Sequence, residues 1–167
     1  MAIAYRGRVF SVEVGERRFP DGKVHRVEIV RHAPSVVVIP VESKGRVVLV
    51  RQYRAPLDCE LWEFPAGGVD AGEAAEDAAR RECEEEIGRV PQVVDRLCAL
   101  YPTPGFCDEQ LIFFYARDLR APKSDSKRGP DEDESIETRI VAIDDARRMV
   151  ARGEIVDLKT AYALTLI

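Results

Sequence analysis

Histidine, cysteine and long apolar runs are all scarce in this chain of 167 residues. The four cysteines form no CxxC pair, and the only histidines are His25 and His32. This composition argues against a structural zinc site and against a disulfide framework. No apolar run approaches the roughly 20 residues that a membrane-spanning helix needs, so no association with a membrane is expected.

Positive charge is also in short supply, with 25 Lys and Arg against 30 Asp and Glu and a net charge of −5. This balance argues against broad binding of nucleic acid but not against a local basic pocket for a phosphate compound. The first ten residues, MAIAYRGRVF, contain no signal-peptide hydrophobic region, which predicts a cytoplasmic protein. The length predicts a single domain, 1–167, that is large enough for a real core.

Apolar periodicity predicts a mixed sheet with three helices, an α+β or three-layer arrangement rather than a doubly wound fold. A turn at 20–23 reads as a hairpin connection, and the polar stretch 120–135 reads as a functional lid or a disordered segment. The apolar residues predict strands at 3–14, 24–31, 35–42, 46–53, 61–64, 92–101, 109–117 and 136–143. Helices are expected up to residue 88, from a cap at Asp144 and Asp145 to about residue 152, and over about 157–167.

Residues 67–88 begin as a glycine-rich turn and continue as a helix in which four glutamates fall within five residues. At 100° per residue, Glu82 and Glu86 fall inside the apolar stripe that faces the core, whereas Glu84 points outward. Glu85 lies at the edge of the stripe. One explanation for the glutamates is a solvent-exposed helix face on which they form i,i+4 ion pairs with arginines, and this explanation suits Glu84. It does not account for the inward pair, because a charge turned toward the core is costly unless it is paired or bound to metal.

The same stretch carries a motif at fixed spacing. Gly67, Glu73 and the run at 81–88 resemble the Nudix box, GX5EX7REUXEEXGU, in which U is a bulky aliphatic residue. Cys83 fills one aliphatic position, and Arg89 replaces the last one. Neither departure touches a proposed ligand.

Further segments resemble the ADP-ribose pyrophosphatase branch of that family, namely 50–54, 60–67, 104–106 and 131–137. The resemblance implies an α/β/α Nudix sandwich, with a core over 34–167 and the box at 67–89. It also implies that the strands within 1–33 form an antiparallel extension used in a homodimer.

The resemblance implies a metal-dependent hydrolase of a diphosphate bond. Carboxylates are hard oxygen ligands that suit Mg²⁺, with Mn²⁺ as a possible substitute. The implied ligands are Glu82, Glu85, Glu86 and the carbonyl of Ala66. Arg81 is interpreted as orienting Glu85 or Glu73, with a surface ion pair as the alternative.

A base is needed to activate water, and the acidic segment near the end of the polar stretch offers two candidates. The resemblance favours Glu132 and then Glu134, while a solvated acidic loop tip is the alternative for each.

Substrate binding is expected to involve arginines and a loop. Arg54 and Arg51 end a strand, and a guanidinium forks onto phosphate oxygens, so Arg54 is favoured for the diphosphate. Arg26 and Glu28 resemble positions that grip the adenine end from the partner subunit, although both also suit the wet face of a strand. Glu109 is the candidate for the terminal ribose hydroxyls, and Gly105 and Phe106 before it are further candidates for substrate binding.

These residues predict hydrolysis of ADP-ribose to AMP and ribose 5-phosphate. One alternative is pyrophosphatase activity on another nucleoside diphosphate sugar. Another is a non-catalytic ligand sensor, which a broken box would favour, but Glu82, Glu85 and Glu86 are all present.

Overall fold

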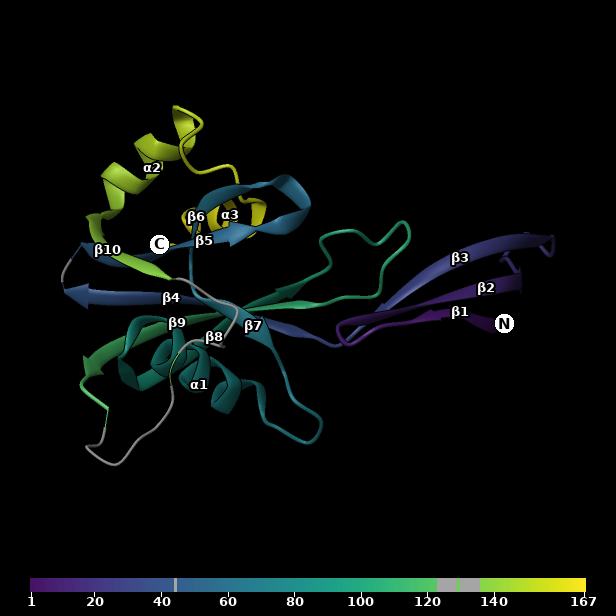
Figure 1. Ribbon diagram of the computed structural model, residues 1–167, viewed down its shortest axis with the longest axis horizontal. Helices are drawn as coiled ribbons and strands as arrows, with labels where there is room; N and C mark the ends of the chain where they lie inside the picture. The colour runs from purple at the N-terminus through teal and green to yellow at the C-terminus, as the bar shows by residue number, and fades with distance from the viewer. Residues whose placement is uncertain (44, 123–128, 130–135) are drawn as a thin grey trace.

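The computed structural model describes residues 1–43, 45–122, 129 and 136–167. A mixed seven-stranded sheet lies between helices on both faces, and a separate three-stranded sheet extends from one end of it (Figure 1). The predicted α/β/α sandwich with an N-terminal antiparallel extension is therefore confirmed.

The central sheet has the strand order β10-β5-β4-β9-β8, with β6 added to β5 and β7 added to β4. β4 and β9 are parallel, and the other pairs are antiparallel. Its strands are β4 (Ser35–Ser43), β5 (Arg46–Arg54), β6 (Cys59–Glu63), β7 (Ala66–Gly68), β8 (Val90–Leu100), β9 (Leu111–Arg120) and β10 (Glu137–Ala142). The helices are η1 (Ala55–Leu57), α1 (Ala75–Ile87), α2 (Ile143–Ala151) and α3 (Leu158–Ala163).

Strand β4 is apolar on both faces because helices cover both. Val36 and Val38 pack with the alanines and Cys83 of α1. Val37 and Ile39 alternate with them and pack on the other face, with residues of α2 and α3. All four valine and isoleucine side chains have no exposed surface, so the strand predicted at 35–42 is buried on both faces.

The N-terminal sheet consists of β1 (Ala2–Arg6), β2 (Phe10–Arg18) and β3 (Val24–His32). The prediction of one strand over 3–14 is wrong, because a turn at Gly7 divides it and the Gly7 amide donates to the Phe10 carbonyl. A Cβ at Gly7 would lie 2.7 Å from the Tyr5 hydroxyl oxygen, so a side chain there would displace the Tyr5 ring. The hairpin turn predicted at 20–23 is present, with Gly22 at φ 85°.

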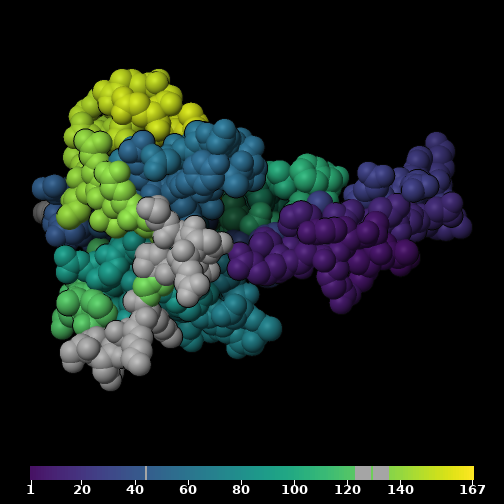
Figure 2. Space-filling view, in the orientation of Figure 1, coloured from purple at the N-terminus to yellow at the C-terminus, as the bar shows by residue number. Residues whose placement is uncertain are grey.

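This sheet forms an arm that projects from the body of the protein (Figure 2). Arg31 fastens the arm at its base, with Nη2 2.9 Å from Glu13 and Nη1 2.8 Å from Asp108. Two backbone hydrogen bonds also join Val30 to the loop before β9, through Phe106 and Asp108. The arm and the loop between β8 and β9 are therefore held together.

Two helix termini differ from the prediction. Asp144 and Asp145 do not cap α2: β10 runs directly into the helix, Ala142 is the N-cap residue, and no side chain caps it. The two acids lie in the first turn, where the carboxylate of Asp144 is 3.0 Å from Nη1 of Arg147. Helix α3 is shorter than predicted, because i→i−3 hydrogen bonds follow it, such as that from Leu166 N to Ala163 O.

Within the described residues, no helix is both long enough and apolar enough to cross a membrane.

Candidate active site

Helix α1 buries two carboxylates along with its apolar side chains. Ala78, Ala79 and Cys83 have no exposed surface and pack on the central sheet. Glu82 and Glu86 are 7% and 6% exposed, which confirms the inward orientation that the helical period predicted. Helix α1 thus brings negative charge to the edge of the core.

The turn before α1 approaches one of these carboxylates closely. A Cβ at Gly67 would lie 2.1 Å from Oε1 of Glu82, whereas a Cβ at Gly68 would meet no atom within 4 Å. Glycine at position 67 therefore lets β7 run directly against the Glu82 carboxylate.

Arg81 lies among the glutamates and contacts several of them. Its Nε and Nη2 each lie 3.0 Å from the Glu73 carboxylate. Its Nη1 donates to Glu82 Oε1 at 2.5 Å and to Glu85 Oε2 at 3.0 Å. Hydrogen bonding to Glu73, together with the charge of Glu82, raises the pKa of Arg81 despite its burial. Arg81 is therefore a cation bound inside the cluster, with Glu73 and Glu85 both among its partners.

Glu73 also joins the loop to the helix. Its Oε2 accepts a hydrogen bond from the Asp70 amide at 3.1 Å while the same carboxylate binds Arg81. Arg81 in turn donates to the Gly68 carbonyl at 2.7 Å. The glycine-rich turn and the first turns of α1 are thus connected by one guanidinium and one carboxylate.

The glutamates fit a divalent metal ion in their chemistry, although they do not yet converge on one point. In the described part of the chain, no three Asp, Glu, His or Cys side chains are gathered as metal ligands. Arg81 contacts the carboxylates of both Glu82 and Glu85. Both side chains nevertheless line one cavity with Glu86 and Ala66. This set of hard oxygen donors is the kind that Mg²⁺ and Mn²⁺ prefer, so the residues fit such an ion once the two carboxylates turn from Arg81.

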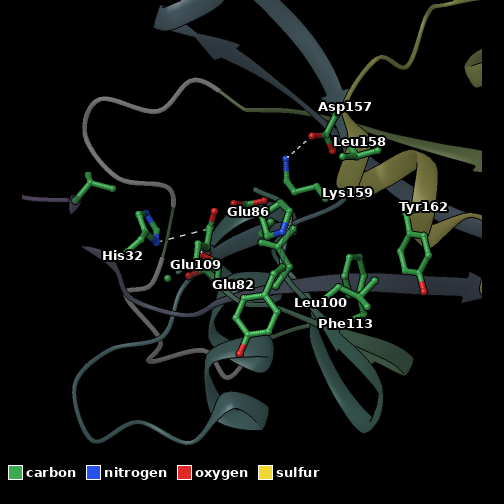
Figure 3. Close-up of a pocket in the computed structure, with 18 of the residues that line it drawn as sticks. His32, Glu82, Glu86, Leu100, Glu109, Phe113, Asp157, Leu158, Lys159 and Tyr162 are labelled. Carbon is green, nitrogen blue, oxygen red and sulfur yellow. Dashed lines mark hydrogen bonds and ion pairs between the residues drawn. The ribbon is translucent and has the colours of Figure 1, made fainter. Parts of the chain in front are cut away.

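The cavity has a volume of about 980 Å³ and lies between α1 and α3 (Figure 3). This volume is within the range of small-molecule and cofactor sites. The glutamates of α1 form one wall, and Arg54 and Lys159 contribute positive charge to another. Its apolar lining includes Val9, Leu100, Tyr101, Pro102, Leu111 and Phe113. The cavity therefore offers carboxylates, cations and apolar surface to one ligand.

Arg54 is held by a buried carboxylate that the sequence reasoning gave no role. Its Nε and Nη2 lie 2.7 and 2.6 Å from the two oxygens of Glu63, which is 1% exposed. Burial opposes the charge of Glu63, but hydrogen bonds from Arg54 and the charge of Lys159 outweigh it and hold the pKa of Glu63 below its usual value. The signal in the sequence was a charged residue between Trp62 and Phe64.

Lys159 was also missed by the sequence reasoning. Its amine contacts the Glu63 carboxylate and lies 2.9 Å from Oδ1 of Asp157. Asp157 is the N-cap residue of α3 and accepts a hydrogen bond from the Thr160 amide. Thr160 in turn accepts from the Phe64 amide at 2.8 Å, so α3 is attached to the segment after β6. An Asp three residues before Thr was a readable cap signal, but nothing local placed Lys159 in the cavity.

The loop residue Glu109 also lines the cavity. Its Oε1 accepts a hydrogen bond from Ser35 Oγ at 2.8 Å and lies 3.6 Å from Nδ1 of His32. His32 and Ser35, both cavity residues, were not predicted. Gly105 and Phe106 do not line the cavity, and Phe106 is 57% exposed on the loop surface.

Three other predicted substrate residues lie outside the cavity of the single chain. Arg51 points elsewhere and pairs with Glu60 at 2.7 Å and Glu137 at 3.5 Å. Arg26 and Glu28 are exposed on β3, in the arm. Glu132 and Glu134 lie outside the described residues. The predicted residues that the structure does bring together in the cavity are Arg54, Ala66, Arg81, Glu82, Glu85, Glu86 and Glu109.

The match of a family model agrees with this geometry. The model of the NUDIX domain matches residues 31–161. The chain belongs to the Nudix family. Its Nudix box, 67–89, runs from β7 through the glycine-rich turn and α1, so it supplies one whole wall of the cavity. Nudix hydrolases generally use divalent metal ions.

Similar proteins cover nearly all of this Nudix chain. An ADP-ribose pyrophosphatase of Bacillus subtilis (strain 168) is 38% identical over 160 residues, which are 96% of this chain and 85% of that protein. A methanol dehydrogenase activator of Bacillus methanolicus is 34% identical over the same shares of both chains. A crystal structure of an ADP compounds hydrolase shares the fold, with a TM-score of 0.85 at 24% identity over 99% of this chain and 88% of that one.

The departures from the Nudix box leave the cavity wall intact. Cys83 occupies its aliphatic position with no exposed surface, in the core beside β4. Burial, together with the charges of Glu86 and Glu82, raises the pKa of this thiol, so it behaves as an apolar core residue. Arg89 is exposed after Gly88, which ends α1 with φ 61°.

Gly67→Ala is expected to weaken metal binding while leaving the fold intact. The added Cβ would displace the carboxylate of Glu82, and because the clash falls on the end of a flexible side chain, the backbone need not move. We expect affinity for Mn²⁺ to fall by roughly 10-fold or more, as measured by calorimetry, with a thermal midpoint close to that of the unmodified chain.

Gly68→Ala is the matched control, because its Cβ meets no atom within 4 Å. Equal Mn²⁺ affinities of the two variants would contradict a role of Glu82 as a metal ligand.

Proposed function

We propose that this Nudix protein hydrolyses the diphosphate bond of ADP-ribose, giving AMP and ribose 5-phosphate. The observation that carries the proposal is one cavity in which the buried carboxylates of Glu82 and Glu86 face the cations Arg54 and Lys159. A diphosphate needs positive charge on both sides, from side chains on one and from a metal ion on the other. The similarity to an ADP-ribose pyrophosphatase over 96% of the chain supports ADP-ribose as the substrate.

The metal ion is Mg²⁺, for which Mn²⁺ can substitute, and Glu82, Glu85, Glu86 and the Ala66 carbonyl would hold it. When bound, such an ion neutralises phosphate charge and makes water a stronger nucleophile. Arg81 contacts Glu82 and lies 3.0 Å from Glu85, so this arginine would fix where the two carboxylates lie beside the ion. Arg81 is thus a positioning residue for the ligands.

The other cavity residues bind and orient the substrate. Arg54 uses Nε and Nη2 on Glu63, which leaves its Nη1 for a phosphate oxygen. Glu109, already bound to Ser35, accepts hydrogen bonds from hydroxyl groups of the terminal ribose. Leu100 and Tyr101 form an apolar surface against which a nucleoside can pack.

A carboxylate from the acidic segment serves as the base that takes a proton from water, with Glu132 favoured over Glu134. We place the protein in the cytoplasm. Gly105 and Phe106 belong to the loop that joins the arm and carries Glu109, and Arg51 acts by fixing the end of β5.

The chain is proposed to act as a homodimer through the arm. The arm carries large exposed apolar side chains that water would otherwise cover, among them Ile3, Tyr5, Val9, Phe10, Phe19 and Val24. In a dimer the arm of one chain brings Arg26 and Glu28 to the adenine end of its partner's site.

Glu82→Gln and Glu86→Gln are each expected to lower kcat by at least about 100-fold, because each removes a charge from the proposed metal ligands. The measurement is AMP release from ADP-ribose with Mg²⁺, with Mn²⁺ and with a chelator, beside a panel of other nucleoside diphosphate sugars. Glu84→Gln is the control, since Glu84 does not line the cavity.

Unchanged turnover in either inward variant would contradict the assignment of the ligands. A higher kcat/KM for another nucleoside diphosphate sugar would make that compound the preferred substrate. No turnover of any compound would favour a ligand sensor.

Glu132→Gln is expected to lower kcat by about 10²-fold or more, the usual contribution of a general base, while Mn²⁺ affinity stays unchanged. Glu134→Gln is its control, two residues away with the same change of charge. A rate loss confined to Glu134→Gln would move the base to that residue.

Gel filtration with light scattering is expected to give twice the chain mass of 18.7 kDa, and Phe10→Glu is expected to shift the population toward the monomer by placing a charge in the interface. Val93→Glu, at an exposed apolar position of β8 outside the arm, is the control. A monomeric mass for the unmodified chain would remove the partner roles of Arg26 and Glu28.

A further inference from the structure

One buried carboxylate holds two cations of the cavity together. Oε2 of Glu63 accepts from Nη2 of Arg54 at 2.6 Å and from the amine of Lys159. Arg54 ends β5, whereas Lys159 belongs to α3, 105 positions later in the chain (159 − 54). Two like charges this close would repel each other, so the charge of Glu63 is what allows them to lie side by side.

The exposure of the three groups shows which way they face. The Glu63 side chain is 1% exposed, while the Arg54 and Lys159 side chains are 36% and 17% exposed, and both line the cavity. Figure 3 shows that Lys159 extends from α3 into the same cavity that Glu86 enters from α1. The exposed parts of both cations therefore face the ligand space, and the anion that binds them lies behind.

Donors remain available on both cations. Among the described residues, the amine of Lys159 contacts only Glu63 and Asp157, which use two of its three N–H groups. Arg54 contacts Glu63 alone there, through Nε and Nη2, so Nη1 is available. An ion pair that served only to attach α3 would not need to leave donors in a cavity.

We propose that Lys159 binds the diphosphate of the ligand together with Arg54, and that Glu63 positions the two. The ligand class is a nucleoside diphosphate, whose phosphate oxygens lie between the cations of β5 and α3 and the carboxylates of α1. The planar guanidinium of Arg54 can bind two phosphate oxygens at once, whereas the compact ammonium of Lys159 acts as a point charge. The inference rests on the proposed function for its choice of ligand, while its test uses binding alone.

The experiment compares Lys159→Met with the unmodified chain for binding of α,β-methylene-ADP in the presence of Mg²⁺, by calorimetry. This compound keeps the diphosphate charge but resists hydrolysis of its bridge. We expect its Kd to rise by about 10-fold or more in Lys159→Met, because a charge-assisted hydrogen bond is lost. Binding of adenosine, which has no phosphate, is expected to stay within about twofold, since the apolar surface is untouched.

Three further variants separate binding from folding. Lys159→Gln keeps hydrogen-bond donors toward Glu63 and Asp157 but no charge, and it is expected to lose affinity as Lys159→Met does. Lys159→Arg keeps the charge and is expected to bind α,β-methylene-ADP within about threefold of the unmodified chain. Arg120→Met, which removes an exposed charge on β9 outside both the cavity and the arm, is expected to change neither Kd nor the thermal midpoint.

Equal Kd values for α,β-methylene-ADP in the folded Lys159→Gln variant and the unmodified chain would overturn the inference. An equal loss of affinity for α,β-methylene-ADP and for adenosine would also overturn it, because that loss reports a disturbed cavity. A selective loss for the diphosphate compound in a protein that does not hydrolyse ADP-ribose would support the inference and refute the proposed function.

Discussion

Charge buried beside opposite charge is the constraint on which the site of this Nudix protein depends. Glu82 and Glu86 on α1 and Glu63 at the end of β6 are almost completely buried, and each is ionisable. A buried charge is strongly destabilising when its partner is removed. Arg81 supplies such a partner within the Nudix box, and Arg54 and Lys159 supply one for Glu63. The ionic contacts therefore hold the site together as well as giving it chemistry.

The two ionic groups face each other because of how the sheet is built. The cavity forms where β4 and β9 begin, at Ser35 and Leu111, and where β5 and β8 end, at Arg54 and Leu100. Because β4 pairs in parallel with β9, and their neighbours pair antiparallel, these four residues lie at the same end of the sheet. Helix α1 covers one face of the sheet and α3 covers the other, so the carboxylates and the cations lie on opposite sides of the cavity.

Local patterns in the sequence predicted much of the fold. The continuous apolar run of β4, the turn at Gly22 and the end of α1 at Gly88 depend on neighbours in the chain, and all were predictable from it. The errors at Gly7 and at the start of α2 were also local. The amino-acid composition marks neither boundary. At Gly7 the chain turns close to the Tyr5 ring, and at Ala142 strand β10 continues directly into α2.

The sequence by itself determined the inward pair Glu82 and Glu86, because the helical period alone sets which residues share a face. Only the tertiary structure decided that Arg54 and Lys159 lie together, because their contact passes through Glu63 and joins segments 105 positions apart (159 − 54). It also decided that Arg51, three residues before Arg54, faces away from the cavity and toward Glu60. Successive residues of a strand alternate in direction, but which face meets a ligand depends on the helices that pack against the sheet.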